Sequence, residues 1–238
     1  MEELTSRLVE WLRDSARMAG AKGFVFGMSG GIDSSVVAVL CMRALPQNTL
    51  GLLLPCYSAA EDMEHARLVA SQFGIPTETV VLDSVYDQLL SVLPAHRGAN
   101  RTLAESNLKP RLRMATLYFF ANNLNYMVVG SSNRCELGVG YFSKYGDGGV
   151  DIMPLGNMVK SQVRGLARFL GIPQVIIDKP PSAGLWPGQT DEAEMGLTYE
   201  QLDAYFTSGE VSPDVKRKIE DRIARNAHKR GTPAIPPF

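Results

Sequence analysis

Short apolar segments alternate with helical segments over most of the chain, and this alternation constrains the fold more than any other feature. The pattern predicts strands at residues 24–28, 49–54, 77–82 and 126–129, and helices at residues 2–18, 33–44, 59–73, 110–124 and 159–170. Strands and helices that alternate at this spacing form a parallel sheet with helices on both faces. We therefore predict an α/β fold, a single domain over residues 1–238 with a mostly parallel twisted sheet flanked by helices.

The composition excludes several classes of protein. Apolar residues make up 45% of the chain and charged residues 21%, which is ordinary globular usage. The net charge of −1 argues against a strongly basic nucleic-acid binder. No stretch approaches the roughly 18 apolar residues of a membrane helix, and no signal peptide is visible. Cys41, Cys56 and Cys135 are far apart and form no Cys-x-x-Cys, so neither a disulfide framework nor a zinc site is indicated. We expect a cytoplasmic protein.

A glycine-rich loop at residues 27–35 follows the first predicted strand and opens the next helix. Its central sequence is Ser29-Gly30-Gly31-Ile32-Asp33-Ser34-Ser35. The backbone N–H groups of such a turn and the positive end of a helix together bind anions. The Walker A and Rossmann glycine patterns are both absent. From the residues alone, Asp33 either reaches a metal held by phosphates or simply caps the helix.

The full Ser-Gly-Gly-x-Asp-Ser pattern in this setting resembles the pyrophosphate loop of N-type ATP pyrophosphatases. The resemblance implies an adenine nucleotide alpha-hydrolase-like, Rossmann-like fold. It also implies that ATP adenylates an oxygen of the substrate, that pyrophosphate leaves, and that a nitrogen or sulfur nucleophile displaces AMP. The loop does not choose the substrate, because GMP synthetase, asparagine synthetase, tRNA-thiolating enzymes and NAD synthetase carry similar loops.

Segments further along the chain resemble the signature blocks of the short, ammonia-dependent NAD synthetases. The most specific are Lys-Tyr-Gly-Asp-Gly-Gly at residues 144–149 and Gly-Gln-Thr-Asp-Glu at residues 188–192. Residues 107–114, 130–136 and 228–230 also resemble blocks of this family, and the blocks run in family order. The chain departs from the pattern in small ways, with Ser131 where threonine is more usual and Pro110 where alanine is usual.

This resemblance implies that the chain amidates nicotinic acid adenine dinucleotide (deamido-NAD) with ammonia, the last step of NAD biosynthesis. ATP is the co-substrate, an acyl-adenylate is the intermediate, and AMP and pyrophosphate are released. Mg²⁺ suits the charge on the phosphates. The resemblance assigns the metal to Asp33 and Glu136. It assigns deamido-NAD to Arg111, Lys144, Asp151, His228 and Lys229. It assigns ATP to Gly27, Met28, Ser29, Gly30, Gly31, Ile32, Asp33, Ser34, Ser35, Ser131, Lys160 and Ser182.

Taken alone, several of these residues have simpler interpretations. Glu136 is equally well explained as a solvated or capping carboxylate, and Lys160 as a solvated helix lysine. In the family reading, Lys160 is the catalytic cation on the ATP phosphates. The second step needs neutral ammonia, and Asp147 is our candidate for the carboxylate that takes a proton from ammonium. The alternative for Asp147 is a turn aspartate favoured by the neighbouring glycines.

Three further expectations concern the whole protein. Residues 93–107 and 179–196 lack periodicity, and we expect them to be mobile loops that close over the ligands. The synthetase blocks fill the chain, so we expect ammonia rather than glutamine as the nitrogen source. The family resemblance implies a homodimer with the substrate site at the interface, which His228 and Lys229 reach from the partner. The apolar faces of residues 2–18 and 110–124 are candidates for the dimer core.

Two other functions compete with this hypothesis. The first is another pyrophosphate-loop ligase, such as a GMP synthetase core, which the downstream blocks do not fit. The second is an RNA-modifying or nucleotide-sensing binding module. The net charge of −1 and the lack of cysteine pairs argue against that class. We therefore expect small-molecule substrates, with no nucleic acid and no membrane as partner.

Overall fold

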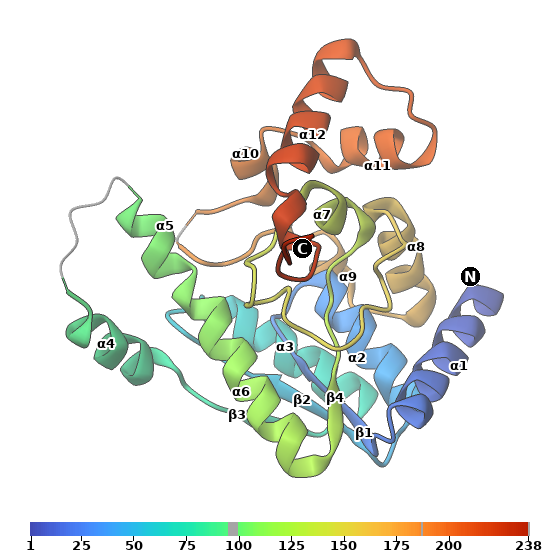
Figure 1. The fold of residues 1–238 in the computed structure, drawn as a ribbon. Coiled ribbons are helices and arrows are strands. Elements are labelled where there is room, and N and C mark those ends of the chain that lie inside the picture. Colours follow the sequence, from blue (N-terminus) through green and yellow to red (C-terminus); the bar gives the residue numbers. More distant parts are fainter. Residues whose placement is uncertain (95–99, 187, 238) are drawn as a thin grey trace.

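The structure is a computed structural model that describes residues 1–94, 100–186 and 188–237. At its centre lies a parallel sheet with the strand order β3-β2-β1-β4 (Figure 1). The strands are β1 (Gly23–Gly27), β2 (Thr49–Leu53), β3 (Thr77–Thr79) and β4 (Tyr126–Val128). Phe24 and Phe26 of β1 pack on one face of the sheet and Val25 packs on the other. Helices cover both faces, which confirms the predicted fold class.

Two hydrophobic clusters fill the space between the sheet and its helices. The larger cluster lies under helices α1, α2, α3 and α8, and the smaller one lies under α4 and α6 (Figure 1). These helices are α1 (Glu2–Met18), α2 (Ile32–Ala44), α3 (Ala60–Phe73), α4 (Asp83–Val92), α6 (Leu108–Leu124) and α8 (Lys160–Leu170). Because α2 lies between the sheet and α1, most of its side chains are buried.

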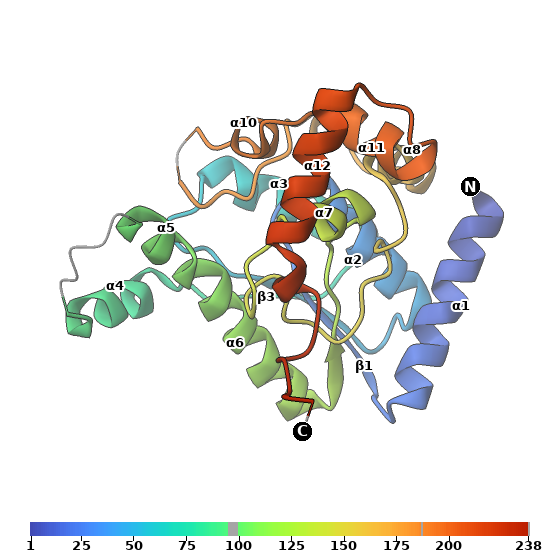
Figure 2. The ribbon, with the colours of Figure 1, turned by 45° about the horizontal axis from the view of Figure 1, so that its top comes forward.

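A third cluster joins the C-terminal helices to the rest of the molecule. Val139, Leu202 and Ile219 are fully buried in it. It is built from α7 (Arg134–Val139), α11 (Tyr199–Thr207) and α12 (Pro213–Arg225), and the 3-10 helix η1 (Ala227–Lys229) follows α12. In Figure 2 these C-terminal elements lie over α7 and the start of α8. The cluster therefore places α11 beside the edge of the sheet where the strands end.

The structure corrects the sequence prediction in three places. The predicted strand at 77–82 ends at Thr79, because it is an edge strand with exposed side chains. The segments 93–107 and 179–196 are not wholly irregular, since they contain α5 (Arg101–Ser106) and α10 (Asp191–Met195). Residues 95–99 and 187 of those segments lie outside the described residues. Helices α4, α7, α11 and α9 (Gln174–Ile177) were also missed, because helices this short depend on tertiary packing.

Among the described residues, no helix is both long enough and apolar enough to cross a membrane.

Candidate active site

The glycine-rich loop lies at the point where the order of the strands reverses. From β1 the chain moves outward to β2 and β3, and it then returns to place β4 on the other side of β1. The glycine-rich loop follows β1, and residues 129–133 follow β4 at the same edge of the sheet. In open α/β sheets, ligands bind in the crevice at this reversal. The topology therefore brings together two segments that are 100 residues apart in the sequence.

The loop is held in one shape by its own polar groups. The Ser34 and Ser35 hydroxyls donate to the Gly31 carbonyl at 3.0 and 2.8 Å, and the Ser29 and Ser34 hydroxyls lie 2.9 Å apart. Gly30 has a φ of +76°, and a Cβ at this position would lie 2.2 Å from the backbone oxygen of Asp62. Only glycine fits such a position.

Two members of the loop face away from any ligand. The side chains of Met28 and Ile32 are buried in the hydrophobic core. Any contribution of these two residues to ATP binding must come from the backbone. Asp33 does not cap the helix, because α2 has Gly31 at its N-cap and the Asp33 carboxylate pairs with Lys160. The capping alternative for Asp33 is therefore wrong.

Asn133 joins the two carboxylates that were predicted to bind a metal. Its side-chain nitrogen donates to Asp33 Oδ1 at 3.1 Å and to Glu136 Oε1 at 2.6 Å. Its side-chain oxygen accepts from the backbone N–H groups of Cys135 and Glu136, which caps α7. Asn133 is fully buried, so its position is fixed by the fold. It lies in the 130–136 block, but nothing in the residue pattern singled it out.

Lys160 is the cation of this cluster, and only 1% of the residue is exposed. It forms an ion pair with Asp33, and its Nζ lies 3.7 Å from Glu136 Oε1. Burial disfavours its charge, but the two carboxylates outweigh burial and raise the pKa of Lys160. Burial, with the nearby Asp33 carboxylate, raises the pKa of Glu136 to about 8. Neither residue is a solvated side chain. The capping alternative for Glu136 is confirmed, because its Oε2 accepts from the Asn133 N–H at 3.2 Å in the capping box of α7.

The donor set at this place fits a magnesium ion bound together with phosphates. Mg²⁺ usually takes one or two carboxylates and fills its other positions with phosphate oxygens and water. Asp33 and Glu136 supply two carboxylates beside an anion-binding loop, held by a shared amide. Within the described part of the chain, no group of three or more His, Cys, Asp or Glu side chains is placed to hold a metal. A magnesium ion here would complete its coordination with water or with phosphate oxygens.

A pocket of about 820 Å³ opens between the start of α3 and the segment 179–190. Asp62, whose backbone touches the glycine-rich loop, lines this pocket together with Ser182 and Trp186. Lys179 closes one side by donating to Asp62 Oδ1 at 2.6 Å. The volume lies within the usual range for small-molecule sites. Ser182 therefore lies where a nucleotide beside the loop would reach it.

Lys109 holds the segment 179–190 beside this pocket, and sequence reasoning missed it. Its Nζ donates to the Leu185 carbonyl at 2.8 Å and lies between the rings of Tyr57 and Tyr86, at 5.8 and 5.7 Å from their centroids. Burial lowers the pKa of Lys109. The neighbouring Arg113 donates to the Leu54 carbonyl at 3.0 Å. Both residues lie in the 107–114 block, which was the available signal.

The residues assigned to deamido-NAD form a second cluster. Arg111 lies 3.4 Å from the Lys144 carbonyl, and Lys144 Nζ donates to the His228 carbonyl at 2.8 Å. Lys229 Nζ donates to the carbonyls of Gly140 and Phe142 at 2.8 and 2.9 Å. The chain thus brings Arg111, Lys144 and the backbone of residues 228–229 together by itself. Lys229 docks the C-terminal segment here, and its contact with substrate stays a prediction.

Three other predicted residues occupy separate places. Asp151 lies apart from the cations, because its carboxylate accepts from the Val128 N–H at 2.7 Å and from the Tyr118 hydroxyl at 2.8 Å. Asp147 accepts from the Ser143 N–H at 2.9 Å, and the charges of Arg113 and Lys229 reach it. Ser131 follows β4 and is half-buried at the sheet edge.

Comparison with known proteins gives a consistent result. The family model described as NAD synthase matches residues 4–233. An NH(3)-dependent NAD(+) synthetase from Carboxydothermus hydrogenoformans is 48% identical over 99% of this chain and 97% of its own length. An NMN synthetase structure from Francisella tularensis has a TM-score of 0.95 and 39% identity, covering 100% of this chain and 98% of that one. An NH3-dependent NAD synthetase structure from Campylobacter jejuni has a TM-score of 0.83 and 28% identity, covering 98% and 97%.

Proposed function

The chain belongs to the NAD synthase family, and from this premise we infer that it is an ammonia-dependent ligase that converts deamido-NAD to NAD with ATP. The observation that carries the inference is the convergence of the glycine-rich loop with Asp33, Glu136 and Lys160 at the reversal point of the sheet. Such a site suits adenylation of a carboxylate, in which negative charge gathers on the transferring phosphoryl group.

The reaction has two steps, and in each one bond forms while another breaks. In the first, the nicotinate carboxylate oxygen attacks the α-phosphorus of ATP, a P–O bond forms, and the bond to pyrophosphate breaks. In the second, the nitrogen of ammonia attacks the acyl carbon, AMP leaves with the electrons of the C–O bond, and the nitrogen loses a proton. The chain must hold two anionic substrates together and keep the acyl-adenylate from water.

We assign the first step to the buried cluster. Lys160 is proposed to pair with ATP phosphates, and its ion pair with Asp33 of the glycine-rich loop supports this. Asp33 and Glu136 are the residues that would hold Mg²⁺, and the ion would neutralise phosphate charge when bound. Arg111, Lys144 and His228 are proposed to bind the dinucleotide, with Asp147 as proton acceptor in the second step. Asp151 is proposed to act on the dinucleotide only indirectly, because its carboxylate is bound to the Val128 N–H of β4.

A direct assay tests this assignment. Purified protein is given deamido-NAD, ATP, magnesium and an ammonium salt, and NAD and pyrophosphate are measured, with XMP and glutamine as alternative substrates. Asp33→Ala and Glu136→Ala should each abolish most pyrophosphate release, because each removes a carboxylate that Asn133 holds at the loop. Glu78→Ala is the control, since Glu78 is an exposed carboxylate on β3. Near-normal pyrophosphate release in both site variants would overturn the metal assignment.

The match to an NMN synthetase favours one second candidate. That structure covers the whole of this chain with a TM-score of 0.95. By the same chemistry, an enzyme that makes NMN by amidation takes the mononucleotide acid, which lacks the AMP half of deamido-NAD. The two candidates differ only in the second substrate, so the adenylation site is unaffected. Measuring kcat/KM for nicotinic acid mononucleotide and deamido-NAD side by side decides between them, and a large preference for the mononucleotide would replace the dinucleotide assignment.

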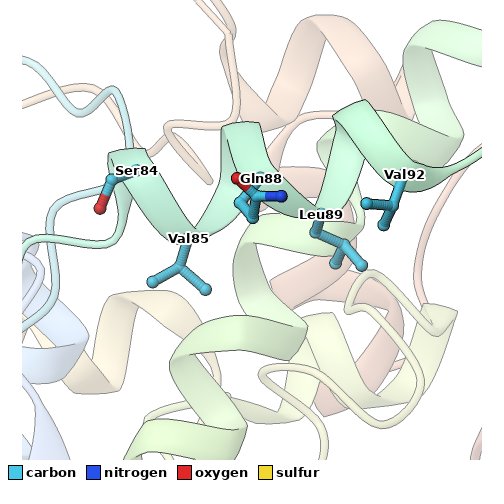
Figure 3. Close-up of a pocket in the computed structure, with 5 residues that line it drawn as sticks. All are labelled: Ser84, Val85, Gln88, Leu89 and Val92. Carbon is cyan, nitrogen blue, oxygen red and sulfur yellow. The ribbon is translucent and has the colours of Figure 1, made fainter.

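We propose that the protein is a homodimer and that α6 supplies part of the interface. The apolar face of α1 is not free for this, because Val9 and Leu12 pack into the core. On α6, Phe119 is 68% exposed, and on the neighbouring α4 an apolar hollow is lined by Val85, Leu89 and Val92 (Figure 3). These apolar side chains are the support for a second copy at this face.

Sedimentation velocity tests the dimer. Phe119→Glu should shift the protein toward the monomer, because it places a charge in the proposed interface. The matched control is Phe169→Glu, since Phe169 on α8 is also exposed, at 46%, but lies on the other side of the sheet. Equal behaviour of the two variants would exclude this interface.

We also propose a cytoplasmic location, supported by the three free cysteines of the chain.

A further inference from the structure

At the start of helix α8, Gln162 Oε1 accepts from the Val159 N–H at 3.0 Å, but α8 offers no side-chain acceptor to the N–H groups of Lys160 and Ser161. Its N-cap residue is Val159, whose side chain has no hydrogen-bond acceptor. The first N–H groups of a helix have no partner within the helix and need one from elsewhere. Asp203, on α11, supplies it: Oδ1 accepts from the Lys160 N–H at 2.9 Å and Oδ2 accepts from the Ser161 N–H at 2.7 Å. A carboxylate 43 residues away in sequence therefore fixes the start of α8.

The same carboxylate also contacts α7. The Cys135 thiol donates to Asp203 Oδ1 at 3.1 Å, and Cys135 is fully buried directly before Glu136. Asp203 therefore connects the backbone that carries Lys160 to the backbone that carries Glu136.

Tyr199 lies one turn before Asp203 on α11 and contacts the side chains of the same two residues. Its hydroxyl is 2.9 Å from Glu136 Oε1 and 2.9 Å from Asp191 Oδ2, and its ring centroid is 4.7 Å from Lys160 Nζ. Tyr199 is 1% exposed. Residues four apart share one face of a helix, so α11 presents both groups to the cluster together. Leu202 is fully buried beside them and fixes that face against the core.

We propose that Tyr199 and Asp203 are positioning residues for the adenylation step, holding Lys160 and Glu136 in the geometry that the nucleotide and its metal require. The proposal rests on the proposed function of Lys160 and Glu136. Tyr199 and Asp203 reach no reacting atom themselves and act through those two residues. Groups that orient the ligands of a site in this way cost about 10- to 100-fold in metal affinity or activity when they are removed.

Tyr199→Phe is the main test, because it keeps the ring under Lys160 and removes only the hydroxyl. Tyr205→Phe is its matched control: Tyr205 lies on the same helix, but its hydroxyl faces Glu220. We expect Tyr199→Phe to lower kcat for pyrophosphate release, or to raise the magnesium concentration for half-maximal rate, by about tenfold or more. The KM for deamido-NAD should change little, and Tyr205→Phe should behave as the wild type.

A binding measurement gives a second readout without turnover. Magnesium and ATP together, without deamido-NAD, should raise the melting temperature of the wild type and of Tyr205→Phe by the same amount. The rise should be smaller for Tyr199→Phe, even if the unliganded melting temperatures agree. Equal rises, or equal losses of activity in the two tyrosine variants, would overturn the proposal for Tyr199.

Asp203 is tested by a graded pair of variants. Asp203→Asn keeps one oxygen that can accept an N–H of α8, whereas Asp203→Ala keeps none. Alanine has a higher helix propensity than aspartate, so the variant does not lower the helix propensity of α11, and the unliganded melting temperature shows whether the fold is kept. We expect activity and the stabilisation by magnesium and ATP to fall in the order wild type, Asn, Ala. Full activity in Asp203→Ala would overturn the positioning role. An inactive wild type would instead overturn the proposed function, so the two failures are distinguishable.

Discussion

Among the single residues of the site, Asp147 is in surroundings that raise the pKa of its carboxyl group. The residue is exposed to solvent, and loss of water around its carboxylate raises its pKa. The Ser143 N–H and the charges of Lys229 and Arg113 oppose the rise. A carboxylate with a raised pKa is a stronger base, and this is what proton transfer from ammonium needs.

Asp147→Asn should therefore slow the second step more than the first. The acyl-adenylate should accumulate in rapid-quench experiments while NAD formation falls, by about 10²-fold if general-base catalysis is the whole effect. In the wild type, the second step should also fall as the pH drops through the raised pKa and the carboxylate loses its charge, and Asp147→Asn should lack this acid limb. An equal loss in both steps would make Asp147 structural or a general substrate contact.

At the scale of elements, the shape of the glycine-rich loop depends on Gly30. Gly30→Ala should destroy ATP binding, because the new Cβ would lie 2.2 Å from the Asp62 backbone, which cannot move aside as a side chain can. Gly20→Ala is the matched control, since Gly20 also has a positive φ, +65°, but has no atom within 4 Å of the added Cβ. Both variants should lose about 1–2 kcal/mol of stability from the unfavourable φ. Calorimetric titration with ATP separates them, and normal affinity in Gly30→Ala would contradict this account.

The segment 179–196 is the second element with a testable behaviour. Two contacts hold its first part against the body, Lys179 with Asp62 and Lys109 with the Leu185 carbonyl. We expect this segment, and the segment 93–107, to be cut by proteinase K in the free protein and protected when ATP and deamido-NAD are bound. Mass spectrometry locates the cuts. Equal cutting rates with and without ligands would exclude a lid role.

At the scale of the whole molecule, the nitrogen source follows from the burial of the cysteines. Cys41, Cys56 and Cys135 are all buried, and burial raises the pKa of each thiol. A thiol with a raised pKa is a poor nucleophile, because the thiolate is the reactive form. The chain should therefore make NAD with ammonium and none with glutamine as sole nitrogen donor in ammonia-free buffer. Robust turnover of glutamine that disappears on mutating one cysteine would contradict this.

Much of the fold could be predicted because hydrophobic periodicity is local. The helices at 2–18 and 159–170 and the strands around Phe24 and Leu52 were found because their buried side chains recur at the helix or strand period. Helix α11 was missed, because only Tyr199 and Leu202 of its nine residues are buried. Its place depends on contacts with Val139 and Ile219, which are far away in the sequence.

The sequence by itself determined the parallel α/β architecture, the glycine-rich loop and the residue types that surround it. Only the tertiary structure decided that Asn133 joins Asp33 to Glu136, that Lys160 is buried between them, and that Tyr199 and Asp203 hold this cluster from α11. The physical reason is the distance along the sequence between the residues that make each contact. A turn or an amphipathic helix is encoded by neighbours in the chain, whereas these polar contacts exist because β4 pairs beside β1 and because α11 packs against α7 and α8.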